Sequence, residues 1–214
     1  MKSIFINNQV WAEKNLDILF FRNGDSILEA QGRDEWEQAA ESKTPAWCYY
    51  NQQEFNGDFH GVLYNWHAVS DPRGLAPEGW KIPAIEHWEQ MADFLGDGQA
   101  LRLRTNEMWR EDDFMPALFK QDYDEEAKGE ENTDENINSI FNSTGFDAQP
   151  SGARGRLGNA FYAIGDSAYW WTSSEDSDEE AYFVLLYVNY DNLQIGGSTD
   201  KRAGHAVRCI RDNK

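Results

Sequence analysis

The strongest hydrophobic pattern in the chain lies between residues 85 and 95. Apolar side chains recur there at steps of three and four residues, with acidic and amide residues between them: Ile85, Trp88, Met91, Ala92 and Leu95. This spacing predicts an amphipathic helix with one face in the core. Gly96 follows at the position where many helices end in a left-handed residue. A helix over residues 85–95 is therefore expected.

Shorter elements are predicted before this helix. Asn7-Asn8 separates two apolar stretches, and asparagine tolerates the positive φ of tight turns, so residues 4–11 are predicted to form a hairpin. A short helix is predicted over residues 33–42, with Trp36 facing inward. Two further stretches are strand candidates by their apolar and aromatic content, residues 16–21 and 46–50.

The last third of the chain predicts a sheet. Residues 181–188 are apolar on both faces, which is typical of a central strand. Further strands are expected at residues 161–164, 168–172 and 205–210. In the last of these, Val207 and Cys209 share one face. A sheet built late in the chain, with helices supplied early, predicts an α+β fold.

A glycine-rich stretch precedes these strands. Residues 150–158 combine three glycines with Arg154 and Arg156, a composition that phosphate-binding loops can have. The glycine spacing matches neither the dinucleotide-binding loop nor the P-loop. A turn-rich connection is therefore predicted here.

Aromatic residues make up 14% of the 214 residues, and nine of them are tryptophans. Rings of this size fill the space between irregular segments. No linker divides the chain, so one domain spanning residues 1–214 is expected. Its structural core is predicted to contain tryptophans that converge in a single interior: Trp66, Trp80, Trp88, Trp170 and Trp171.

The chain is strongly acidic, with 38 acidic against 19 basic residues and a formal charge of −19. Such a surface repels phosphate backbones and anionic membranes, so no nucleic acid and no membrane insertion is expected. Cations and basic surfaces are the complementary partners. Acidic residues are dense and apolar residues few at about 111–138, which predicts an acidic surface insertion within the domain.

Seven motifs resemble, in the same order, those of a known family. They are Tyr-Asn-Trp at 64–66, Asp-Pro-Arg-Gly-Leu-Ala-Pro at 71–77, Gly-Trp-Lys-Ile-Pro at 79–83, Glu-His-Trp at 86–88, Ser-Thr-Gly-Phe-Asp-Ala at 143–148, Tyr-Trp-Trp-Thr-Ser-Ser-Glu at 169–175 and Ala-Val-Arg-Cys-Ile at 206–210. Together they resemble the Fibrobacter succinogenes major paralogous domain family over most of the chain.

The resemblance implies a C-type-lectin-like fold, with antiparallel sheets, two or three short helices and long irregular loops. The same superfamily holds formylglycine-generating enzymes and many non-catalytic binding domains. It carries no catalytic residue onto this chain. The expected function is a non-catalytic binding module that displays loops to a protein or glycan partner. In the family pattern the Tyr169–Trp171 motif lies in the interior, which favours a core role over an open platform for sugar rings.

One alternative function is an oxidase like the formylglycine-generating enzymes, which act through reactive cysteines. The chain has two cysteines, Cys48 and Cys209. Neither has the cationic, partly exposed surroundings that an activated thiolate needs. Many relatives carry a cysteine where Ala76 stands here, which removes one partner for Cys209. Pairing of Cys48 with Cys209 stays open, and no catalytic residue is assigned.

A second alternative is a calcium-dependent carbohydrate binder. The four histidines have no metal-binding spacing, so no cofactor is expected and no metal ligand is assigned. Calcium is the candidate ion, because a lectin-like scaffold can offer loop carboxylates and amides as ligands. The acidic run lacks the spacing of an EF-hand.

Localisation is expected to be cytoplasmic for the chain as written. No apolar run approaches the roughly 20 residues of a membrane helix, and the apolar start reaches Asn7 before a signal-peptide core forms. The resemblance implies a bacterial origin and, for many relatives, export. Secretion or a cell-surface location is the alternative if the N-terminus is trimmed.

Overall fold

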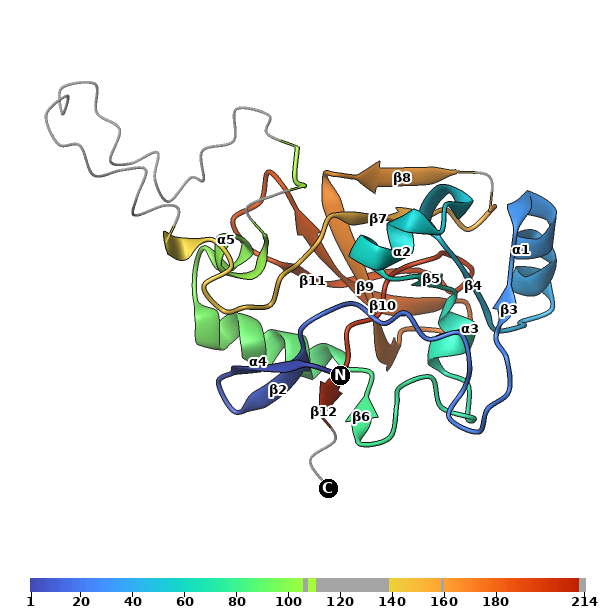
Figure 1. The fold of residues 1–214 in the computed structure, drawn as a ribbon, viewed down its shortest axis with the longest axis horizontal. Coiled ribbons are helices and arrows are strands. Elements are labelled where there is room, and N and C mark those ends of the chain that lie inside the picture. Colours follow the sequence, from blue (N-terminus) through green and yellow to red (C-terminus); the bar gives the residue numbers. More distant parts are fainter. Residues whose placement is uncertain (106–107, 111–138, 159, 212–214) are drawn as a thin grey trace, which may run out of the picture.

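The computed structural model describes residues 1–105, 108–110, 139–158 and 160–211. The acidic insertion predicted at 111–138 lies outside the described residues. Three sheets and five short α-helices form the described part, where the sequence predicts two or three helices (Figure 1). The fold is α+β with mainly antiparallel sheets, as the sequence predicts.

The largest sheet has five strands in the order β11-β10-β9-β7-β8. Their bounds are β7 Ser151–Arg154, β8 Phe161–Ile164, β9 Ser167–Glu175, β10 Glu180–Tyr187 and β11 Gln194–Asp200. Strand β10 pairs on both sides, which confirms the predicted central strand. All pairs are antiparallel except β7 with β9, which meet in parallel at Gly152 and Ala168.

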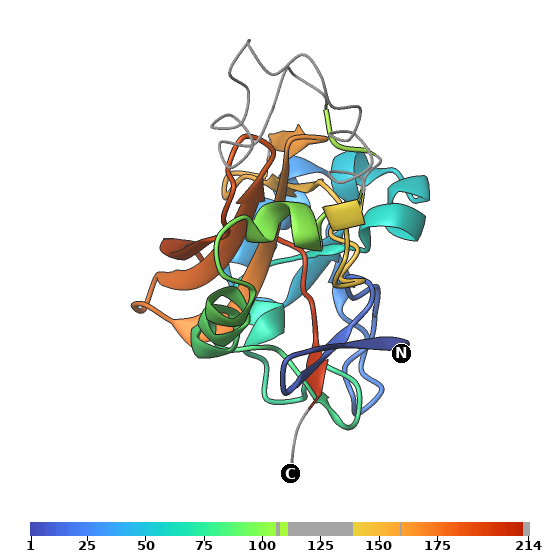
Figure 2. The same cartoon turned by 90° about the vertical axis from the view of Figure 1, so that its left-hand side faces the viewer.

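The second sheet joins the two ends of the chain in the order β1-β2-β12-β6 (Figures 1 and 2). Its strands are β1 Ser3–Ile6, β2 Gln9–Ala12, β6 Trp80–Lys81 and β12 Ile210–Arg211. Strands β1 and β2 form the predicted hairpin, and Asn7 at its turn has φ 54°. Strand β12 pairs with both β2 and β6.

The third sheet is small and lies among the early helices. Its strands are β3 Leu28–Glu29, β4 Ala46–Cys48 and β5 Leu63–Tyr64, with β3 and β4 parallel. The helices are α1 Gly32–Glu41, α2 Phe55–His60, α3 Trp66–Val69, α4 Ile85–Leu95 and α5 Gln99–Leu103, with a 3-10 helix at Tyr50–Gln52. The helix predicted at 33–42 forms one residue earlier, at Gly32–Glu41. The strand predicted at 46–50 begins at Ala46 as expected but ends at Cys48.

Helix α4 has the bounds that its apolar spacing predicts, and Gly96 after it has φ 68°. Ala84, which precedes the helix, has no polar side-chain atom that could cap the first turn of α4. Instead the Ala84 amide donates to Nδ1 of His87 at 3.1 Å, and the Ile85 amide donates to Oγ of Ser174 at 3.0 Å. These bonds satisfy two donors that a helix start leaves free. The apolar face of α4 packs against β9, β10 and β11.

The structure buries all five tryptophans of the predicted core, Trp66, Trp80, Trp88, Trp170 and Trp171. They lie in two hydrophobic clusters rather than one interior. Consecutive residues of a strand point to opposite faces, so β9 sends Trp170 to one side and Trp171 to the other. Trp170 packs on Trp88 with ring centroids 5.4 Å apart. Trp171 stacks on His205 at 4.3 Å, in the cluster that holds Trp66 and Trp80.

The strand predicted at 205–210 is wrong except at its end. Residues 205–209 make only single bridges and isolated backbone hydrogen bonds, and these go to three different segments. His205 bonds to Tyr64, Ala206 bonds to residues 169 and 171, and Val207 bonds to Leu16. Residues 205–210 are all buried. The segment is therefore an extended connection through the core, and a regular strand begins only at Ile210.

Two other predictions are corrected. Residues 16–21, which are all described, form no strand: Phe20 makes one bridge to Ser26, while Leu16 bonds to the C-terminal segment. Residues 151–154 of the predicted turn-rich connection form β7. Gly152 has φ 61° within that strand, and the predicted turn is confined to residues 156–158.

Candidate functional site

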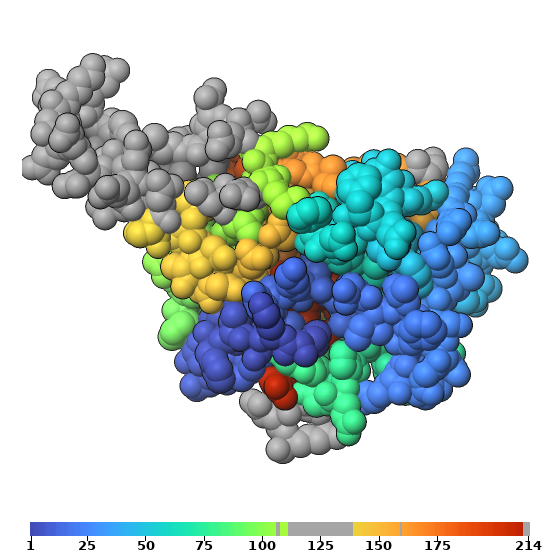
Figure 3. All heavy atoms as spheres, in the orientation of Figure 1, coloured from blue at the N-terminus to red at the C-terminus, as the bar shows by residue number. Residues whose placement is uncertain are grey.

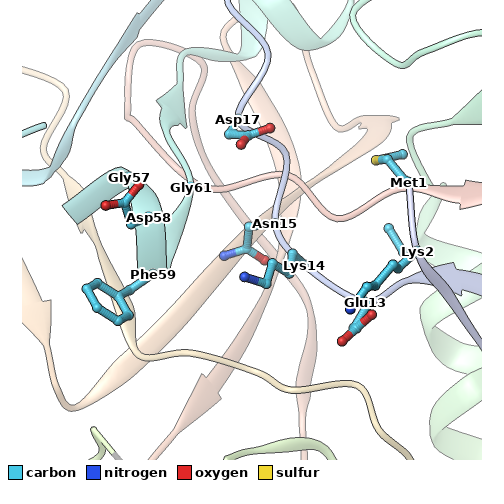
Figure 4. A pocket seen from close by; sticks show the side chains of 11 residues that line it. Met1, Lys2, Glu13, Lys14, Asn15, Asp17, Gly57, Asp58, Phe59 and Gly61 are labelled. Carbon is cyan, nitrogen blue, oxygen red and sulfur yellow. The ribbon is translucent and has the colours of Figure 1, made fainter. Parts of the chain in front are cut away.

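A hollow of about 480 Å³ with mixed polar and apolar walls opens between residues 12–17 and helix α2 (Figures 3 and 4). We call it the outer hollow. A second hollow of about 140 Å³, the inner hollow, shares the wall residues Lys14, Asn15, Asp58 and Phe59 with it. The inner hollow extends to residues from distant parts of the chain, Asp147, Gln149 and Arg208. The two hollows are therefore neighbours with four wall residues in common.

Helix α2 presents two aromatic rings to solvent, and one of them, Phe59, lines the outer hollow. Phe55 and Phe59 are four residues apart and are 61% and 59% exposed. The buried side of α2 carries a polar residue, Asn56. Its side-chain amide donates a hydrogen bond to the Tyr50 carbonyl at 2.8 Å. Phe59 lines both hollows, and Figure 4 shows it beside Asp58 across from Lys14.

Gly61 fixes the distance between α2 and residues 15–16. Its φ is 73°, in the region that favours glycine. A Cβ at this position would lie 2.7 Å from the carbonyl oxygen of Leu16 and 3.0 Å from Cβ of Asn15. Only glycine allows this approach, so the glycine after α2 brings the two walls of the outer hollow together.

Asn15 joins the walls of the site through its buried side chain. Its Nδ2 donates to the carbonyl of His60 at the end of α2, at 2.9 Å. Its Oδ1 accepts from Nε1 of Trp170 at 2.9 Å and from Nε of Arg208 at 3.0 Å. One amide thus connects α2, the largest sheet and the C-terminal segment.

Arg208 is fully buried at the back of the inner hollow. Its Nη1 donates to the carbonyls of Ala12, Glu13 and Phe146 at 3.1, 2.6 and 2.6 Å. The guanidinium also lies over the Phe146 ring, 4.3 Å from its centroid. Burial lowers the pKa of Arg208 to about 9, so the group is still a cation at neutral pH.

Two residues that line the inner hollow each have a buried side-chain atom without a hydrogen-bond partner among the described residues. The atoms are Nη2 of Arg208, which is a donor, and Oε1 of Gln149, which is an acceptor. A buried polar group without a partner costs about 1–3 kcal/mol.

Both cysteines are free, and each is buried in a different hydrophobic cluster. Burial raises the pKa of Cys48 to about 11, although Arg154 nearby acts in the opposite direction. Burial likewise raises the pKa of Cys209 to about 12. Neither thiol lines the outer or the inner hollow. This arrangement does not favour a cysteine thiolate acting as a nucleophile in either hollow.

We expect both thiols to react slowly in the native protein. With Ellman's reagent at pH 8, each cysteine should react at least about a hundredfold slower than in the unfolded chain, because both access and thiolate fraction are reduced. The same protein in guanidinium chloride supplies the reference rate for each site. A cysteine that reacts in native protein as fast as in the unfolded chain would contradict the buried, protonated state.

In the described part of the chain, no group of three or more His, Cys, Asp or Glu side chains is arranged to hold a metal ion. The calcium site stays a prediction. One ring of oxygens holds an ammonium instead: Nζ of Lys201 donates to the carbonyls of Ser177 and Asp178 at 2.7 and 2.8 Å and to the Glu175 carboxylate. Lys201 is buried and its Nζ lies 4.7 Å from the centroid of Trp66.

Sequence reasoning assigned no residue to this site. Lys14, Asn15 and Phe59 lie outside every element that the sequence predicts, and Arg208 lies in the predicted strand at 205–210. One local signal was present: two phenylalanines four residues apart, Phe55 and Phe59, in an otherwise polar segment with Gly57 and Gly61. Large rings in a polar segment are typical of exposed contact surfaces.

Together, the fold and the hollows define an α+β protein with a surface hollow of mixed polar and apolar character, whose volume is in the range of small-ligand sites. The family model described as the Fibrobacter succinogenes major domain matches residues 4–211. The chain belongs to that family. No match was found among curated proteins or among solved structures. Within the described residues, no helix is both long enough and apolar enough to cross a bilayer.

Proposed function

We propose that this chain is a non-catalytic binding module and that its ligand occupies the outer hollow. The observation that carries the proposal is the hollow itself: about 480 Å³ of space with mixed polar and apolar walls and with the exposed ring of Phe59 at its rim. Binding sites combine a few placed polar groups with an aromatic surface in this way. Loops and short helices held by a rigid sheet are the elements that usually carry such sites.

The wall of the outer hollow carries charged residues of both signs, which suits a ligand with polar groups. It includes the cationic residues Lys2 and Lys14 and the anionic residues Glu13, Asp17 and Asp58 (Figure 4). Donors and acceptors are thus available on facing sides. The aromatic ring adds apolar contact area with little loss of side-chain entropy on binding.

The non-catalytic part of the proposal is supported by the thiols. Oxidase chemistry of the formylglycine-generating kind requires reactive cysteines, whereas Cys48 and Cys209 are buried with raised pKa values and lie outside the hollows. The conclusion is a module that holds a partner without changing it.

The scaffold in this proposal is the C-type-lectin-like fold that the sequence motifs imply. The α+β arrangement, the mainly antiparallel sheets and the many residues outside regular elements support it. So does the joining of β1, β2 and β12 in one sheet. An experimental structure whose strand order differs from that of lectin domains would contradict this part.

Truncating the aromatic rim tests the site. We expect Phe59→Ala to weaken binding of any ligand found on arrays of defined glycans and defined peptides by at least about tenfold, because the ring supplies a large share of the contact area. Phe94→Ala is the matched control, since Phe94 is similarly exposed at 56% but lies on α4. Both variants are compared with the wild-type protein by calorimetric titration.

Three results would overturn the proposal. The first is that neither array yields a ligand. The second is that Phe59→Ala binds as tightly as the wild-type protein, and the third is that Phe94→Ala loses as much affinity as Phe59→Ala. In the last two cases the ligand binds elsewhere on the surface.

A further inference from the structure

The chain contains two Asn-Gly-Asp sequences, at residues 23–25 and 56–58. An asparagine followed by glycine can modify itself, because the amide nitrogen of the glycine can attack the side-chain carbonyl carbon of the asparagine. Glycine has no Cβ to obstruct this approach. The residues that react are the same in both sequences, so their surroundings in the folded protein decide which asparagine reacts.

Asn23 lies in an exposed turn. Residues 22–26 are all exposed, between the buried residues Phe21 and Ile27. The Gly24 amide donates to the Phe21 carbonyl at 2.9 Å, which closes the turn. Exposed turns with few packed neighbours are among the parts of a protein that open at little cost in free energy. A Cβ on Gly24 would have no described atom within 4 Å, so the space around this glycine is open.

The neighbouring Asp25 contacts both polar atoms of the Asn23 side chain. Its backbone amide donates to Oδ1 at 3.0 Å, and its Oδ2 accepts from Nδ2 at 3.0 Å. A donor on Oδ1 withdraws electron density from the carbonyl carbon and stabilises the negative charge that develops on the oxygen during attack. The carboxylate lies at Nδ2, the nitrogen that leaves. Both contacts are therefore compatible with attack on this carbonyl.

Asn56 has the opposite surroundings, because it lies inside α2 and is only 7% exposed. Its Nδ2 donates to the Tyr50 carbonyl at 2.8 Å, and the Gly57 amide donates to the Glu54 carbonyl at 2.8 Å. The Tyr49 ring covers Gly57, since a Cβ there would overlap with Cε1 of that ring. Attack by the Gly57 nitrogen therefore requires α2 to open, and only a fraction of the molecules is open at any time.

We propose that Asn23 is a site of spontaneous deamidation in the folded protein. The Gly24 nitrogen forms a bond to Cγ of Asn23, and the bond between Cγ and Nδ2 breaks. The proton of the Gly24 amide leaves with Nδ2 as ammonia. Water then opens the resulting cyclic imide at either carbonyl carbon, which yields aspartate or isoaspartate. Water is the only co-reactant, and no group is oxidised or reduced.

The reaction changes the charge of a turn that contacts a second loop. The Arg22 amide donates to the Gly74 carbonyl at 2.9 Å. Nη1 of Arg73 pairs with Oδ2 of Asp25 at 3.2 Å. A carboxylate at position 23 cannot donate to Asp25, so two like charges meet where a hydrogen bond was. Deamidation is therefore expected to weaken the contacts of this turn with the loop that contains Arg73, and this turn does not line the outer hollow.

Peptide mapping by mass spectrometry tests the proposal on the wild-type protein. The folded protein and the same protein in guanidinium chloride are held in mildly alkaline buffer at one temperature, and the conversion of both asparagines is followed. In the folded protein we expect Asn23 to convert at least about tenfold faster than Asn56, which reacts only when α2 is open. In guanidinium chloride the two rates should become similar, because the reacting sequences at 23–25 and 56–58 are identical.

Three results would overturn the proposal. The first is that Asn56 converts as fast as Asn23, or faster, in the folded protein. The second is that Asn23 keeps its amide in the folded protein, which would mean that the hydrogen bonds of the turn block the attack. The third is that Asn23 remains tenfold faster in guanidinium chloride, because the selectivity would then come from the flanking sequence and not from the fold. All three leave the Phe59→Ala test valid.

Discussion

The Arg208→Met variant is expected to lose about 4 kcal/mol of its free energy of unfolding. The guanidinium of Arg208 is fully buried and bonds to three backbone carbonyls, those of Ala12, Glu13 and Phe146. Methionine fills much of the same volume but donates no hydrogen bond. Each carbonyl left without its partner costs about 1–3 kcal/mol, and the gain from no longer burying a cation offsets part of the sum.

The measurement is urea denaturation followed by tryptophan fluorescence. Arg33→Met is the control, because Arg33 lies on the exposed side of α1 in an ion pair with Glu37, and the change should be within about 0.5 kcal/mol. Arg208→Lys should remain strongly destabilised, since an ammonium cannot reproduce the geometry of the planar fork. A loss below about 1 kcal/mol for Arg208→Met would mean that these carbonyls find other partners.

Gly152→Ala is expected to destabilise the protein by about 3–4 kcal/mol. Gly152 has φ 61° inside β7, a conformation that costs other residues about 1–2 kcal/mol. A Cβ there would lie 2.5 Å from the Tyr162 carbonyl oxygen, 2.7 Å from Cε2 of Tyr50 and 2.8 Å from the Ile164 amide nitrogen. Two of these contacts are backbone atoms of β8, so the clash can be relieved only by moving a strand.

Gly155→Ala is the matched control for this prediction, three residues away in the same stretch. The closest atom to a Cβ at Gly155 is the Ala160 carbonyl oxygen at 3.5 Å, and its φ is not in the left-handed region. We expect a change within about 0.5 kcal/mol. Thermal and urea denaturation of both variants measures the difference. Equal effects at the two positions would show that the close approach of β7 and β8 carries little of the cost.

The elements that the sequence predicts well are those with one face on the core and one in water. Helix α4 has this character, and so does the β1–β2 hairpin, in which Asn7 adopts the expected positive φ. Strand β10 was recognised for the opposite reason, since an apolar run on both faces is specific to an inner strand. In each case the pattern of neighbours is regular along the element.

Residues 205–210 show where such patterns fail. Protein surrounds this segment on all sides, so its burial does not alternate, and its backbone bonds are shared among segments near Leu16, Tyr64 and Trp170. Alternation of Val207 and Cys209 with Arg208 therefore predicted a strand that does not form. The arginine is as buried as its neighbours, because carbonyls from elsewhere in the chain replace the water around it.

The candidate site could not be found by spacing for a related reason. Asn15 and Arg208 are 193 positions apart and meet through one hydrogen bond. Gln149 and Phe59 come from two further segments. None of these residues belongs to a sequence motif that by itself indicates a binding or catalytic role. What the sequence does contain is Gly61, the residue that allows α2 to approach residues 15–16, and its role becomes clear only from the backbone contact with Leu16.

The ammonium of Lys201 lies among two carbonyl oxygens and a carboxylate, where many proteins would place a dissolved ion. A dissolved ion exchanges with the medium and is removed by chelators. The positive charge here belongs to a side chain, so it is covalently attached and neither exchanges with the medium nor is removed by chelators. The turn that follows β9 is therefore expected to keep its shape in the presence of a metal chelator, and to lose these contacts when Lys201 is replaced.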